Sequence, residues 1–159
     1  MATMNLKAEI KSIDSIIQVE LAIKELFPNA VIPKNEGDIS FPMTKERLNI
    51  EIIDLDYTYF FEKIHNNRIA DTALDCMSQN IVNDTSTFKI SRQAALAGKI
   101  AFVLQEDTPL GGCFELTLDS VNLNAWIEEM TWHKGREIVP REVGDELKMR
   151  YDGAHQDWF

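Results

Sequence analysis

Apolar and polar residues alternate at the start of the chain, over residues 4–13. On one side of an extended backbone lie Met4, Leu6, Ala8 and Ile10. On the other side lie lysine, glutamate and asparagine residues, which is typical of a strand with one buried face and one solvated face. The sequence therefore predicts that the chain opens with a half-buried strand.

The hydrophobic period then changes to that of a helix, over residues 14–30. An apolar stripe at helical spacing consists of Val19, Ala22, Ile23 and Leu26. Asp14 or Ser15 can cap the helix, Ser15 and Gln18 fit a capping box, and Pro28 stops the helix. Further on, residues 30–34 and 38–42 flank the turn "NEG" and predict a hairpin. Residues 47–55 alternate and predict another strand, although their Glu and Leu residues also allow a helix.

Two helical segments follow, over residues 56–67 and 68–82, and "NDTST" after them predicts a turn. Strands are predicted from Phe88, in the apolar stretch 98–105 and, most clearly, over residues 113–120, where apolar residues alternate. Residues 106–112 form a turn cluster between the last two of these strands. Residues 122–132 carry a helical stripe again and predict the last helix.

This order of elements, β-α-β-β-α-α-β-β-β-α, predicts an α+β fold with a mainly antiparallel sheet and helices packed on it. Residues 1–132 are expected to form a single domain, because a chain of 159 residues has the length of one ordinary domain. Residues 133–159 have weak periodicity and are expected to form a C-terminal extension. Part of this extension would be ordered by the packing of four apolar residues, Val139, Leu147, Trp158 and Phe159.

Charge and cysteine content narrow the class of protein. The chain has 16 Lys and Arg against 26 Asp and Glu, a net charge of −10, which does not fit a protein that coats DNA. Cys76 and Cys113 stand in no disulfide or metal motif, which favours reduced thiols and a cytoplasmic protein. The N-terminal residues contain no long apolar stretch, and no segment approaches a membrane span, so neither a secretory signal nor a membrane partner is expected.

Candidate catalytic chemistry is sparse. The sequence contains no nucleophile elbow, phosphate loop, dinucleotide fingerprint or zinc motif. Asp71 and Asp75 lie one helical turn apart and could form an acid pair, but neither has a histidine or nucleophile tied to it in the sequence. A metal site built from the tail is conceivable, yet exposed polar residues are the favoured interpretation of His133, Asp152, His155 and Asp157. We expect no enzyme activity, no cofactor and no metal.

One segment, "SRQAALAGKIAF" at residues 91–102, differs from the acidic rest of the chain. No acid occurs between Asp84 and Glu106. The candidate phosphate-binding residues of this region and of the preceding helical turn are Arg68, Lys89, Arg92, Gln93 and Lys99. On composition alone, an ordinary solvated strand face with a bend at Gly98 is favoured over a binding site, because three charges make a small patch.

Three motifs in this order, "RIADTALDCM", "FKISRQAALAGKIAF" and "DTPLGG", resemble an uncharacterised archaeal protein family often labelled as predicted RNA-binding. The likeness covers about residues 4–132. It implies a fold like that of the large-subunit ribosomal protein that binds 5S RNA, and a role in RNA binding. The second glycine of "PLGG" departs from the proline expected in that family.

The leading hypothesis is therefore a non-enzymatic RNA-binding accessory protein that uses the basic residues named above. The alternative is a protein-interaction or self-association module, a homodimer for example, that uses a sheet edge and the Trp158–Phe159 tail. A third hypothesis is a small phosphate ligand bound at the same basic residues. No DNA partner is expected.

Overall fold

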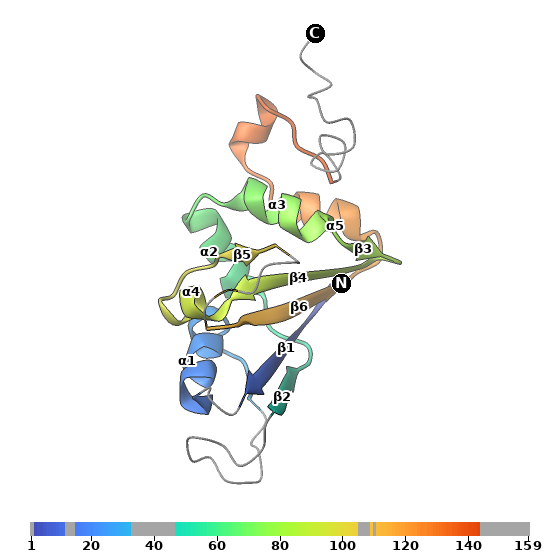
Figure 1. The fold of residues 1–159 in the computed structure, drawn as a ribbon. Coiled ribbons are helices and arrows are strands. Elements are labelled where there is room, and N and C mark those ends of the chain that lie inside the picture. The colour runs from blue at the N-terminus through green and yellow to red at the C-terminus, as the bar shows by residue number, and fades with distance from the viewer. Residues whose placement is uncertain (1, 12–14, 33–46, 105–108, 110, 144–159) are drawn as a thin grey trace.

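The computed structural model describes residues 2–11, 15–32, 47–104, 109 and 111–143. In chain order its elements are β1 (Thr3–Lys11), α1 (Ile16–Leu26), β2 (Arg47–Ile52), α2 (Thr58–Asn66), α3 (Ala70–Ser78), β3 (Ile81–Val82), β4 (Thr85–Ser91), α4 (Arg92–Leu96), β5 (Phe102–Val103), β6 (Cys113–Asp119), α5 (Leu123–Met130) and the 3₁₀ helix η1 (Lys134–Glu137). Figure 1 shows their arrangement. The predicted α+β class is confirmed.

The six strands form one antiparallel sheet in the order β2-β1-β6-β4-β3, and β5 pairs with another part of β4. The first strand therefore lies inside the sheet, between β2 and the last strand, β6. Every second residue of β1, β4 and β6 is buried. This alternation is the pattern that predicted β1 and β6 from the sequence.

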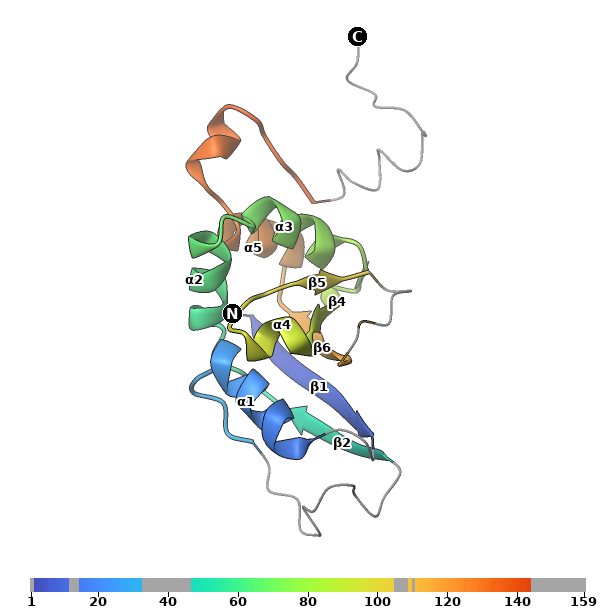
Figure 2. The ribbon, with the colours of Figure 1, turned by 60° about the vertical axis from the view of Figure 1, so that its left-hand side comes forward.

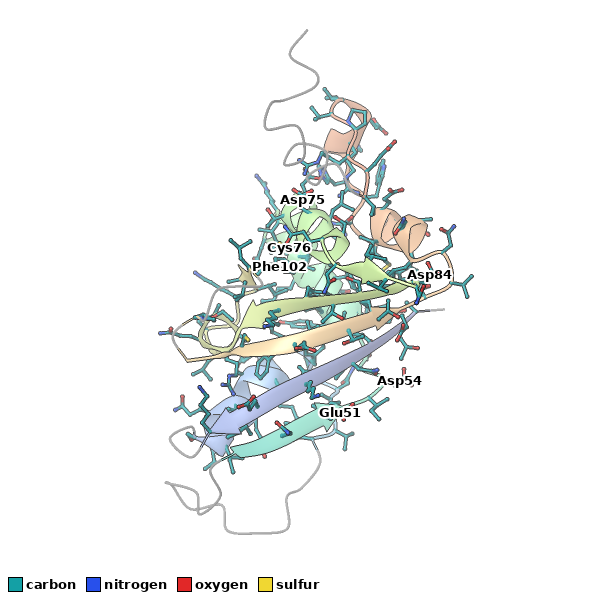
Figure 3. The ribbon with its side chains drawn as sticks, turned by 45° about the vertical axis from the view of Figure 1, so that its right-hand side comes forward. Glu51, Asp54, Asp75, Cys76, Asp84 and Phe102 are labelled. Atoms are coloured by element: carbon teal, nitrogen blue, oxygen red, sulfur yellow. The ribbon has the colours of Figure 1, made fainter. Side chains whose placement is uncertain are left out.

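The helices lie on one face of the sheet and cover the buried residues of the strands, as Figures 1 and 2 show. In Figure 2, α1 and α4 lie beside each other over the sheet. The ring of Phe27, at the end of α1, stacks on the ring of Phe60 in α2, with 5.4 Å between centroids and 12° between planes. The opposite face carries no helix among the described residues and is called the open face below; Figure 3 views the sheet from that side.

Local sequence signals explain where α1 begins and ends. The Ser15 hydroxyl accepts a hydrogen bond from the Gln18 backbone N–H, at 3.4 Å, and so caps the helix. The helix ends at Leu26, two residues before Pro28, as expected. None of the described helices is long and apolar enough to cross a lipid bilayer.

The second helical segment is shorter than the sequence predicted. Its helix, α3, ends at Ser78, and residues Ile81–Val82 form β3 instead. Asn83 and Asp84 both have positive φ, at 51° and 60°, which is the geometry of a two-residue type I′ hairpin turn between β3 and β4. The hairpin forms here in place of the end of the predicted helix. The turn predicted over "NDTST" consists of Asn83 and Asp84 only.

The basic segment contains a short helix, α4, where the sequence favoured a solvated strand face with a bend at Gly98. Ser91 caps it by accepting a hydrogen bond from the Ala94 N–H. At its other end Gly98 has φ +75°, its N–H donates to the Ala95 carbonyl, and the Lys99 N–H donates to the Ala94 carbonyl. These two bonds form a Schellman motif, which confirms the bend expected at Gly98.

Two strand predictions remain to be placed. The apolar stretch 98–105 forms only the two-residue strand β5 among its described residues. The predicted hairpin over residues 30–42 lies outside the described residues except for 30–32, which form neither helix nor strand.

Candidate functional site

The five basic or polar candidates do not form one surface. Gln93 and Lys99 are exposed at the two ends of the α4 segment, and Arg68 is exposed in the turn between α2 and α3, with φ 57°. Lys89 lies on the open face of the sheet, and Arg92 is buried. The structure thus separates residues that are neighbours in the sequence.

Arg92 is part of the fold, with 8% of its surface exposed. Its Nη1 donates a hydrogen bond to the backbone carbonyl of Glu9, at 3.1 Å. Its guanidinium carbon lies 6.0 Å from the centre of the Phe114 ring, within the range of a cation–π interaction. The side chain therefore links α4 to β1 and β6, and it is not available to a ligand in this conformation.

Gly112 leaves room for the Arg92 side chain. A Cβ atom at Gly112 would lie 2.0 Å from Nη2 of Arg92 and 2.7 Å from its guanidinium carbon. Gly112 also has φ +83°, and its carbonyl accepts a hydrogen bond from the Arg92 N–H. The second glycine of "PLGG", which departs from the resembled family, is thus required by the buried arginine.

Lys89 belongs to a row of alternating charges across the open face. In register it stands opposite Glu115, which stands opposite Lys7 of β1, which in turn stands opposite Glu51 of β2. Opposite charges at directly paired positions stabilise a sheet modestly. Lys89 is therefore balanced by a carboxylate and does not extend a cationic patch.

The rest of the open face is polar and close to neutral. Its described outward residues on the four longest strands are Thr3, Asn5, Lys7, Glu9, Lys11, Asn49, Glu51, Thr85, Thr87, Lys89, Ser91, Cys113, Glu115, Thr117 and Asp119. This set contains three lysines, four carboxylates and no aromatic ring. A sheet that stacks RNA bases needs aromatic side chains on that face, so these positions offer no stacking platform.

The acid pair of α3 holds the segment after α5. The Asp71 carboxylate accepts hydrogen bonds from Nε2 of His133, at 3.0 Å, and from Nε of Arg136, at 3.1 Å. His133 Nδ1 accepts from the Gly135 N–H, so Nε2 is the nitrogen that carries the proton toward Asp71. We call the contacts of His133, Arg136 and Arg141 with Asp71 and Asp75 the C-terminal clasp.

Arg136 is the most buried member of the clasp, with 4% of its side chain exposed. Besides Asp71, it donates to the Glu128 carbonyl and to the Thr131 hydroxyl, each at 3.0 Å. Farther along, Nη2 of Arg141 donates to both carboxylate oxygens of Asp75 and forms an ion pair with it. Both aspartates of the acid pair therefore bind side chains of the segment that follows α5.

The clasp extends to the end of the described chain. The Val143 N–H donates to the Glu128 carboxylate, at 2.9 Å, and the Val143 side chain packs against the core. Figure 1 shows this segment lying at the α3–α5 end of the molecule. Among the described residues no group of three His, Cys, Asp or Glu side chains could hold a metal ion. Of the conceivable tail site, only His133 is described, and it is part of the clasp.

The clasp predicts a pH dependence of stability. Partial burial raises the pKa of Asp71, but the hydrogen bonds from His133 and Arg136, together with the Arg136 charge, lower it below its usual value. A carboxylate with a lowered folded-state pKa stabilises the protein above its unfolded-state pKa, and this contribution is lost as the pH falls through the folded-state pKa. We expect the difference in unfolding free energy between the wild type and Asp71→Asn to shrink below about pH 4. Urea denaturation of both proteins between neutral and acid pH measures it, and a constant difference would contradict the assignment.

Comparisons with known proteins show which proteins resemble this chain in sequence and in fold. No protein-family model matches the chain. A UPF0201 protein of the archaeon Sulfurisphaera tokodaii is 26% identical over 132 residues, which cover 82% of this chain and 88% of the relative. The crystal structure of a UPF0201 protein from Methanococcus jannaschii superposes with a TM-score of 0.67 at 19% identity, covering 82% of this chain and 99% of that one. Another UPF0201 protein, described as uncharacterized, gives a TM-score of 0.61 at 21% identity over 76% of this chain and 84% of that one.

These similarities support the resemblance to uncharacterised archaeal proteins that the motifs indicated, and the solved structures share the fold. The names of these relatives assign no ligand and no reaction. The expected likeness to the 5S RNA-binding ribosomal protein stays a prediction.

Proposed function

We infer that this chain is a divergent relative of the archaeal UPF0201 proteins, and we propose that it is a non-enzymatic self-association module that pairs through the edge of β2. The observation that carries the proposal is the outer edge of this strand. β2 pairs with β1 on one side, it ends the strand order, and no described residue pairs with its other side. Figure 3 shows it as the last strand of the sheet, with Glu51 labelled on it.

The two edges of the sheet differ in a way that supports this choice. On the far side, the edge of β4 is divided between β3 and β5, which have two residues each. β2 has six residues, the usual length of a strand. A row of unpaired N–H and C=O groups of that length is a template for another strand, unless the protein blunts it.

The absence of a catalytic role is part of the same proposal. The acid pair and the nearest histidine of the described chain are engaged in the clasp, and the buried arginine is engaged in the fold. A catalytic acid or base needs access to a substrate in a pocket, and these groups bind other parts of the same chain instead.

The proposal predicts a dimer in solution. We expect sedimentation velocity between about 1 and about 200 µM protein to show a monomer and a species of twice its mass in exchange, because edge pairing alone buries a small interface of micromolar affinity. A monomer at every concentration would contradict self-association.

RNA binding is the second candidate, supported by the resemblance and by two lysines that lie near each other. Lys99 is exposed directly after Gly98, and the Lys63 ammonium lies 3.4 Å from the position of a Cβ at Gly98. The Glu25 carboxylate lies 3.5 Å from the same position and weakens this small patch. Arg92 does not belong to the candidate surface, because it is buried.

If RNA binds here, we expect weak binding with a log–log salt slope of about −1 to −2 in fluorescence anisotropy, the slope of two or three phosphate contacts to a single strand. Lys63→Glu/Lys99→Glu should then abolish binding, because these two lysines lie near each other. Lys7→Glu/Lys134→Glu, an equal change of charge at exposed lysines of β1 and η1, serves as the control and should alter binding little. No binding of single-stranded or structured RNA at low salt would remove this candidate.

A further inference from the structure

We propose that two copies of this chain pair β2 with β2 in antiparallel orientation, about a two-fold axis that passes through Asn49, so that the two sheets become one continuous sheet. This inference rests on the proposed self-association, and it adds the register and the residues that determine it. A two-fold axis makes the interface self-complementary, since each copy presents the same strand.

The alternation of β2 limits the possible registers. Ile50 and Ile52 are buried toward the helices, whereas Asn49 and Glu51 are exposed. Directly opposite residues of an antiparallel pair lie on the same face of a sheet. A two-fold register centred between two residues would place buried positions opposite exposed ones, and it is excluded. Only registers centred on a residue keep the apolar face of both copies toward the helices.

The sequence "RLNIE" at 47–51 is complementary to itself about its central residue. Centred on Asn49, Arg47 stands opposite the partner's Glu51, and Leu48 stands opposite the partner's Ile50. Asn49 meets the partner's Asn49 on the axis. Two opposite-charge pairs and two apolar pairs result from a strand of six residues.

The neighbouring register is less favourable. A pairing centred on Ile50 places Glu51 opposite the partner's Asn49 and Arg47 opposite the partner's Ile53, which loses both charge pairs. Ile53 follows β2 and is 69% exposed. The Asn49 register therefore has the better complementarity of charge.

The charges within one copy favour the same register. In the β1–β2 pairing Arg47 stands opposite Lys11, so the directly opposite position on β1 holds no carboxylate. The partner's Glu51 would place a carboxylate at the position opposite Arg47 on the other side of β2. It would also continue the alternating row of the open face, in which Glu51 follows Lys7.

A charge exchange tests the register by sedimentation velocity. Glu51→Arg and Arg47→Glu each convert two opposite-charge pairs of the dimer into like-charge pairs, and each should raise the dissociation constant about tenfold or more. The double variant Arg47→Glu/Glu51→Arg restores both pairs and should return the constant to within about threefold of the wild type. Lys89→Glu changes a charge on the open face three strands away from β2, and it should leave dimerisation nearly unchanged.

Cross-linking gives a second measurement that does not depend on charge. Directly opposite residues of an antiparallel pair have Cα atoms about 4.5–5.5 Å apart, which fits a disulfide. In a Cys76→Ser/Cys113→Ser background, which removes both native thiols, Asn49→Cys should give an oxidised dimer. Ile53→Cys, in the same background, should not. Circular dichroism of each variant checks that it folds.

The outcomes separate the two levels of the proposal. A wild type that dimerises but shows neither rescue by the double variant nor cross-linking at position 49 overturns the Asn49 register and leaves self-association standing. A wild type that stays monomeric overturns both. Rescue together with selective cross-linking establishes the register.

Discussion

Replacing Asp71 with alanine is expected to lower the free energy of unfolding by about 2–3 kcal/mol. The change removes the carboxylate from a guanidinium that is almost fully buried, since 4% of the Arg136 side chain is exposed. A buried charge without its counter-ion is costly because water cannot solvate it. Asp71 itself is 40% exposed, so the loss should fall below that of a fully buried ion pair. Urea denaturation at neutral pH measures the difference.

Asp75→Ala provides the matched control for this prediction. It removes the other carboxylate of α3, whose partner is Arg141. The Arg141 side chain is 29% exposed, so water can solvate its guanidinium when the carboxylate is gone. We expect a loss of about 1 kcal/mol. Arg136→Met, which removes the buried charge and keeps an apolar stem, should be tolerated better in an Asp71→Ala background than in the wild type. Equal losses for the two alanine variants would contradict the central place of Arg136 in the clasp.

Gly112→Ala is expected to lower the free energy of unfolding by about 2–4 kcal/mol. A positive φ costs an alanine about 1 kcal/mol, and a methyl group in the space of the Arg92 guanidinium adds about 1–3 kcal/mol. To make room, Arg92 would have to break its hydrogen bond to the Glu9 carbonyl. Thermal and chemical denaturation both report this change.

Gly111→Ala separates the two causes. Gly111 has nearly the same backbone conformation, with φ +85°, but a Cβ there would meet only the Cβ of Gln93, at an ordinary 3.5 Å. We expect a loss of about 1 kcal/mol, from backbone strain alone. Shortening Arg92 to alanine should relieve most of the additional cost of Gly112→Ala. If Gly111→Ala and Gly112→Ala lower the free energy of unfolding equally, the close approach of the Arg92 guanidinium to Gly112 does not contribute to the loss.

The sequence predicted those elements whose signals are local. Alternation identified β1 and β6, and the Ser15 cap, the apolar stripe and Pro28 identified α1. Helix propensity failed at residues 79–82, because the left-handed turn at Asn83 and Asp84 folds β3 back onto β4. The helix α4 escaped prediction, because its five residues span little more than one turn and leave no periodic pattern.

The candidate site was harder to predict, because its partners are distant in the sequence. Asp71 and Asp75 were recognisable as an acid pair, but their partners lie 62 to 66 residues away. Composition grouped Arg92 with the exposed Lys99, although the Glu9 carbonyl that binds Arg92 is 83 residues away. The resembled family favours proline at the position of Gly112. The glycine found there was the sequence signal that a side chain packs against the backbone at this position. The edge position of β2 follows from topology alone.

The pairing of the first strand with the last has a consequence for synthesis on the ribosome. In the order of the described strands, β4 and its neighbours are joined to β1 and β2 through β6, with Thr3 opposite Asp119. A nascent chain can pair β1 with β2 early, but the two parts of the sheet cannot be joined until residue 119 has left the exit tunnel. The sheet is therefore completed only after most of the chain has been synthesised, which makes its formation dependent on contacts that are distant in the sequence.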